Sequence, residues 1–134
     1  MKLKKFITNF MVIILAMASF SLTAGAAEQT DDVSATLRAL NANTLISSAT
    51  KTTADTTCDY FKWTGGTTQN LNVWIENEDD YIVGPKVKFA KAQDKFIKIP
   101  YRTGITFNTN ATAYMYAEQS SFSSKTLFGC AKYS

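Results

Sequence analysis

The sequence predicts an all-β protein whose main part is a small antiparallel β-sandwich, or a partly open barrel, of roughly six to seven strands. Between residues 58 and 130, apolar and polar side chains alternate in short segments, which is the pattern of strands with one buried face. Turn-forming residues separate these segments at intervals of about ten residues, a spacing typical of sandwiches. A third observation is a composition shift near Thr57, because residues 28–57 contain no aromatic residue.

Residues 1–27 have the pattern of a secretory signal peptide. Lys2, Lys4 and Lys5 precede an uncharged apolar segment at residues 6–22, and small residues follow it at 23–27. We therefore expect cleavage after residue 26 or 27 and a secreted, extracellular product. Its contact with a membrane would be limited to the signal peptide before cleavage. The alternative, a retained membrane anchor, is disfavoured by the small residues at the end of the segment.

Residues 28–57 are rich in Ala, Thr, Ser, Asn and Asp. Val33, Leu37 and Leu40 recur at positions i, i+4 and i+7, which predicts a short amphipathic helix. Residues 47–57 have little to bury and are typical of a solvated linker. The sequence thus predicts an N-terminal segment at 28–57, in which the helix docks on the sheet or belongs to a disordered leader, followed by a β-domain at 58–134.

Strand character is strongest in seven segments, which lie at residues 58–63, 71–75, 81–90, 96–101, 105–107, 112–117 and 125–130. Pro85 interrupts the third segment and lacks a backbone N–H, so we expect an edge strand or a bulge there. Beyond it, the alternation places Val87 inward and places Lys86 and Lys88 outward.

Cys58 and Cys130 are the only cysteines, and they lie in the first and last predicted strands. An even cysteine count in an exported chain predicts a disulfide, which would stabilise the fold by roughly 4 kcal/mol through loop closure. The alternative is a pair of free thiols. Without histidine, these two sulfurs do not make a zinc site.

Charge and composition exclude several classes of function. The net charge of +3 comes from Lys2, Lys4 and Lys5, so the mature chain is neutral and lacks the field that collects nucleic acid. The absence of histidine removes the usual base of a hydrolytic triad. No glycine-rich phosphate loop follows a predicted strand. We therefore expect a protein that is not an enzyme, has no cofactor and does not bind nucleic acid.

An acidic turn is the one candidate for metal binding. Its carboxylates belong to Glu76, Glu78, Asp79 and Asp80. Calcium prefers six to eight oxygen ligands from a curved loop, which these side chains would supply in part. The spacing differs from the twelve-residue calcium loop, however, and acidic residues are ordinary in exposed turns. A solvated turn is therefore the alternative.

Three aromatic residues are the candidates for ligand binding. Tyr114 and Tyr116 share one face of their predicted strand, and Trp74 lies on the face opposite Val73 and Ile75. If these rings face solvent, they form a platform of the kind that recognises sugars or proteins. The alternative is that they pack in the core between two sheets.

These observations predict a monomeric, secreted bacterial protein that acts by surface recognition of a cell-envelope glycan or protein. A bacteriocin-like antagonistic protein is a first alternative, because a short exported chain with a cleavable leader is compatible with it. A secreted enzyme inhibitor is a second, because strands tied by a disulfide would hold a rigid loop. A growth-inhibition assay and a protease-inhibition assay distinguish these alternatives from recognition.

Overall fold

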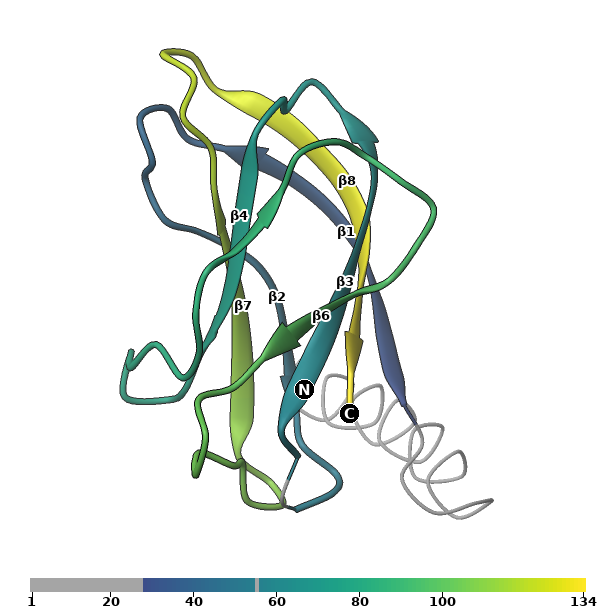
Figure 1. The fold of residues 1–134 in the computed structure, drawn as a ribbon, viewed down its shortest axis with the longest axis vertical. Coiled ribbons are helices and arrows are strands. Elements are labelled where there is room, and N and C mark those ends of the chain that lie inside the picture. The colour runs from purple at the N-terminus through teal and green to yellow at the C-terminus, as the bar shows by residue number, and fades with distance from the viewer. Residues whose placement is uncertain (1–27, 55) are drawn as a thin grey trace, which may run out of the picture.

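A computed structural model describes residues 28–54 and 56–134, which form eight strands in two four-stranded antiparallel sheets (Figure 1). The first sheet has the order β1 (Gln29–Leu37), β8 (Lys125–Tyr133), β3 (Cys58–Gly66) and β6 (Ile97–Pro100). The second has the order β2 (Thr44–Thr50), β7 (Thr112–Glu118), β4 (Leu71–Glu76) and β5 (Val87–Phe89). The all-β prediction is confirmed, with eight strands in place of six or seven. The predicted signal peptide lies outside the described residues.

The short helix predicted around Val33 and Leu37 is wrong, because this segment forms β1. Residues four apart share one face of a strand as well as one face of a helix, so the apolar spacing fits both. β1 pairs with β8 and both side chains are buried in the core, whereas Leu40 is exposed in the following turn with a φ of 58°. β1 and β2 each form one edge of a sheet. The described part of the chain contains no helix of the length and apolarity that crossing a membrane requires.

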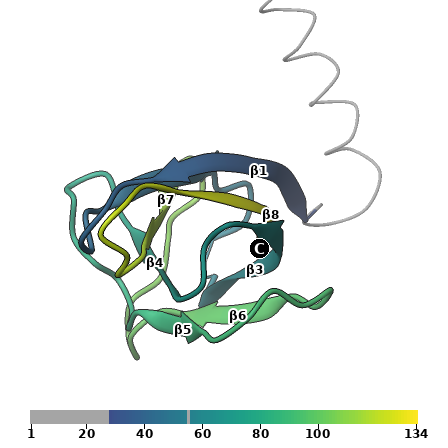
Figure 2. The same ribbon diagram turned by 90° about the horizontal axis from the view of Figure 1, so that it is seen from above.

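The core lies between the two sheets, whose strands are seen from above in Figure 2. Strand alternation decides which side chains enter it: on β7, Ala113, Met115 and Ala117 are buried and alternate with half-buried tyrosines. The rings of Phe61 on β3 and Phe89 on β5 meet edge to face across the sheets, with centroids 5.7 Å apart. β5 is the edge strand expected beyond Pro85.

The predicted disulfide between Cys58 and Cys130 is wrong, because both thiols are free. β3 and β8 are neighbours, but their register places Cys130 opposite Lys62, four positions along the strand from Cys58. Four strand residues span roughly 13 Å, and a disulfide requires Cα atoms within about 7 Å. Export to an oxidising compartment favours a disulfide, but it carries no information on strand register.

Alkylation tests this free-thiol state. A thiol reagent added to unreduced, denatured protein should label both cysteines, because no bond protects them. In the native protein Cys130 should react faster than Cys58, since Cys58 is the more buried of the two. Mass spectrometry of the labelled peptides measures both results. Unlabelled cysteines in the denatured sample would contradict the observed strand register.

Candidate functional site

Trp74 lies on the outer face of the second sheet, as the strand alternation predicts, but it is not exposed. Its side chain has 0% accessible surface. The ring of Tyr116 stacks on it, with centroids 6.0 Å apart and planes inclined by 17°. The ammonium of Lys86 lies 4.2 Å from the centre of the indole ring. The expectation that Trp74 itself forms an exposed platform is therefore wrong, because neighbours on its own face cover it.

Polar contacts hold this stack in place. The indole Nε1–H of Trp74 donates a 2.8 Å hydrogen bond to Glu76. Lys86 forms a 2.8 Å ion pair with Glu118, whose other oxygen accepts a 3.1 Å hydrogen bond from Asn72. Glu76 and Glu118 are both buried, and charge-assisted bonds of this kind are stronger than neutral ones. The outer face is thus ordered around the tryptophan.

Tyr114 and Tyr116 are half-buried and point outward, since the residues between them on β7 face the core. Leu45 on β2 lies directly opposite Tyr116 and is 48% exposed. Burial, together with the charge of Glu76, raises the pKa of Tyr116. We call this surface the outer patch; its members are Leu45, Trp74, Lys86, Tyr114 and Tyr116.

A polar hollow of about 290 Å³ adjoins the outer patch. It is lined by Asn41, Asn70, Asn72, Lys88, Gln119 and Ser120, and we call it the amide hollow. Asn72 lies two residues before Trp74 on β4, so the hollow and the patch share one sheet face. The backbone N–H of Asn41 donates a 2.8 Å hydrogen bond to the carbonyl of Gln119, which fixes the two loops to one another.

No pattern in the sequence predicts the amide hollow. Asn41, Asn70 and Gln119 come from separate loops that only the sheet order brings together. Polar residues in loops are expected in any soluble protein, so composition does not single these out. Among the lining residues, strand alternation predicts the outward direction of Asn72 and Lys88 only.

The predicted calcium site consists of Glu76, Glu78, Asp79 and Asp80. Their carboxylates do not converge on one point. Glu76 bonds the indole of Trp74, and Glu78 accepts a 2.9 Å hydrogen bond from the backbone N–H of Thr112. Within the described ranges, no three acidic or sulfur-bearing side chains gather in a way that would hold a metal ion. The acidic turn is held by its own hydrogen bonds instead, because the side-chain oxygen of Asn77 accepts from the backbone N–H groups of Asp79 and Tyr81.

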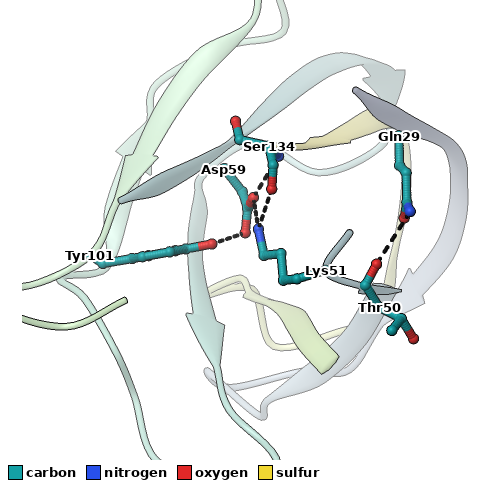
Figure 3. A network of polar contacts seen from close by, with 6 residues as sticks. All are labelled: Gln29, Thr50, Lys51, Asp59, Tyr101 and Ser134. Carbon is teal, nitrogen blue, oxygen red and sulfur yellow. Dashed lines mark hydrogen bonds and ion pairs between the residues drawn. The ribbon is translucent and has the colours of Figure 1, made fainter. Parts of the chain in front are cut away.

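A second cluster lies inside the sandwich and joins the two sheets (Figure 3). Lys51, directly after β2, forms an ion pair with Asp59 on β3, and both side chains are 0% exposed. The hydroxyl of Tyr101 donates a hydrogen bond to Oδ2 of Asp59. Ser134 contributes two backbone contacts: its N–H donates to Oδ1 of Asp59 at 3.1 Å, and its carbonyl accepts from Lys51 at 3.2 Å. We call these four residues the buried network.

Aromatic rings surround the ammonium of this network. Nζ of Lys51 lies 5.5 Å from the ring centres of Tyr101, Phe107 and Tyr133. Burial lowers the pKa of Lys51, and the nearby Asp59 offsets this only in part. Burial and the charge of Asp59 raise the pKa of Tyr101, which therefore stays a hydrogen-bond donor.

The sequence did not predict the buried network, because Lys51 lies in a segment whose polar composition is typical of a solvated linker. One signal was available: alternation places Asp59 on the same strand face as Phe61 and Trp63, which face the core. A buried carboxylate requires a partner, so the inward position of Asp59 predicts a cation from elsewhere in the chain beside it. The sequence does not say which of the lysines provides it.

The chain matches no protein-family model, and neither a curated protein nor a solved structure is significantly similar to it. The outer patch, the amide hollow and the buried network are therefore the basis for assigning a function.

Proposed function

We propose that the protein is exported and binds a cell-envelope glycan on the outer face of the second sheet, without catalysing a reaction. The observation that carries this proposal is the link between the outer patch and the amide hollow: Asn72, which lines the hollow, donates a hydrogen bond to Glu118, and Glu118 forms the ion pair with Lys86 of the patch. A sugar ring has one apolar face and an edge of hydroxyl groups. It therefore fits a surface on which an aromatic ring borders a set of carboxamides.

Tyr116 is the residue best placed to stack on a sugar. Trp74 stacks against the tyrosine ring, and Tyr116 is half-buried, so part of it remains accessible to solvent. A ring that is already fixed loses little conformational entropy when it binds a ligand. Leu45 extends the apolar surface next to it.

The amide hollow supplies hydrogen-bonding groups beside this ring. Each carboxamide carries a donor and an acceptor, so Asn41, Asn70 and Asn72 match hydroxyl groups, which also donate and accept. Lys88 adds one positive charge to the hollow. That charge favours glycans that carry carboxylate or phosphate groups.

A protein ligand is the second candidate, and two exposed apolar side chains favour it. Leu40 is 60% exposed and Phe122 is 92% exposed. They lie in neighbouring loops, because the backbone N–H of Leu40 donates a 2.9 Å hydrogen bond to the carbonyl of Ser121. Exposed apolar side chains beside a binding hollow are typical contacts in protein interfaces.

The variant Tyr116→Ala tests the glycan proposal. It should weaken retention on immobilised bacterial cell-wall polysaccharide at least about fivefold, since anchor side chains contribute on the order of 1–3 kcal/mol to binding. Tyr60→Ala is the matched control, because Tyr60 is a half-buried tyrosine on β3 of the other sheet.

Retention is measured for both variants at a temperature at which circular dichroism shows them folded. Equal retention of the two variants would contradict the placement of the site. Loss of a protein ligand with Phe122→Ser, with no effect of Tyr116→Ala, would support the second candidate instead.

A further inference from the structure

We propose that Lys51 and Asp59 condense to form an amide bond between their side chains, which links the two sheets covalently. Lys51 follows the last residue of β2 in the second sheet, and Asp59 is the second residue of β3 in the first. The inference is independent of glycan binding, because the buried network lies between the sheets and the outer patch lies outside them.

The reacting groups are already in contact and shielded from water. Nζ of Lys51 donates a hydrogen bond to Oδ1 of Asp59, and neither side chain has accessible surface. Reacting groups held in such contact behave as though they were present at effective concentrations of about 10⁵–10⁸ M. The backbone of Lys51 is fixed as well, since it exchanges hydrogen bonds of 2.7 and 2.8 Å with Ala111 and Asn110. Burial lowers the pKa of Lys51, which favours the neutral amine that acts as the nucleophile.

The reaction balances without any further reactant. A proton passes from Nζ to Oδ1 of Asp59, which leaves a neutral amine and a carboxylic acid. The nitrogen lone pair then attacks Cγ, and the negative charge develops on Oδ2. A second proton passes from the nitrogen to Oδ1, the bond between Cγ and Oδ1 breaks, and Oδ1 leaves as water. An ammonium and a carboxylate are thereby converted into one amide and one water molecule, with no oxidation or reduction.

Tyr101 is placed to stabilise the charged intermediate. Its hydroxyl donates to Oδ2, the oxygen on which negative charge develops. The pKa of Tyr101 is raised by burial and by the charge of Asp59, so the hydroxyl keeps its proton. Its ring is fixed by packing against Phe107, at a centroid distance of 5.1 Å.

The product would have both of its polar groups satisfied by partners that are already in place. The amide N–H retains the carbonyl of Ser134 as acceptor, at 3.2 Å from Nζ. The amide oxygen, formerly Oδ2, retains the hydroxyl of Tyr101 as donor. Condensation also replaces two buried charges by one neutral group, which removes the cost of keeping both ions out of water.

The mass of the full chain after export, denatured and reduced, tests the bond. The measured mass of the wild type should be lower than the mass calculated from its sequence by one water molecule. Asp59→Ala and Lys51→Arg should each have the full mass calculated from their sequences. Trypsin locates the bond, because acylated Lys51 is not a cleavage site. The wild type should give residues 39–62 as a single peptide lacking one water, and Asp59→Ala should give 39–51 and 52–62 separately. Full mass with cleavage after Lys51 in the wild type would overturn the proposal, whether or not the variants fold.

Tyr101→Phe tests the positioning role, because it keeps the ring and removes the donor. The fraction with the full mass should be larger than in the wild type and should fall at least about tenfold more slowly with time, as expected when one donor to a developing oxyanion is lost. Tyr133→Phe is the control, since the Tyr133 hydroxyl has no hydrogen-bond partner in the described residues. Condensation of Tyr101→Phe at the wild-type rate would overturn the role of Tyr101.

Discussion

Lys51→Met should destabilise the protein by about 3–5 kcal/mol, because it leaves the carboxylate of Asp59 buried without its cation. Asp59 has no accessible surface, and Tyr101 and Ser134 provide hydrogen bonds to it but no positive charge. The loss is expected whether the two residues form an ion pair or an amide, since methionine can form neither. Denaturant unfolding monitored by circular dichroism measures this loss.

The double variant Lys51→Met/Asp59→Leu is the control for this effect. It removes both charges and keeps approximate side-chain volume, and replacement of a whole buried pair by apolar residues is often close to neutral. It should therefore be more stable than Lys51→Met alone. A double variant that is less stable than the single one would show that the loss arises from packing around Lys51 and not from an unpaired charge.

Trp74→Ala should also destabilise the protein strongly, by about 3–5 kcal/mol, because it opens a large cavity on the outer face. The indole has no accessible surface and packs between Tyr116 and Lys86. The variant also leaves Glu76 buried without the hydrogen bond that it accepts from the indole N–H. Thermal and denaturant unfolding measure this loss.

Tyr114→Ala is the matched control for Trp74→Ala, because Tyr114 lies on the same sheet face but is only half-buried. It should be clearly the milder change, with a cost of about 1 kcal/mol. Similar losses for the two variants would contradict the buried position of Trp74. This experiment separates a structural tryptophan from an exposed binding platform.

Strand alternation predicted much of the sandwich, because successive side chains along a strand point to opposite faces of the sheet. The segment at 112–117 became β7 with Ala113, Met115 and Ala117 inward. The helical interpretation failed at Val33 and Leu37, where a four-residue spacing fits a helix and a strand equally. Alternation said nothing about register, which is the property that separates Cys58 from Cys130.

The candidate sites were less predictable, since they depend on contacts between segments. The outward direction of Trp74 followed from the sequence, but its burial depends on Lys86, which precedes β5, and on Tyr116 from β7. Lys51 and Asp59 are close in sequence, but Lys51 directly follows β2 of the second sheet and Asp59 lies on β3 of the first, so their contact depends on how the two sheets pack. A lysine among threonines is usually solvated, so local composition pointed away from a buried ion pair.

The two indole N–H groups offer the most direct test that the outer face of the second sheet binds glycan. The chain has two tryptophans: Trp74 lies under Tyr116, whereas the indole N–H of Trp63 donates to the carbonyl of Gly65 in the first sheet. Their resonances can be followed by NMR while soluble cell-wall oligosaccharides are added. We predict that the Trp74 indole signal shifts in a saturable way and that the Trp63 signal stays in place. A saturable shift of Trp63 with no change at Trp74 would contradict the proposed site.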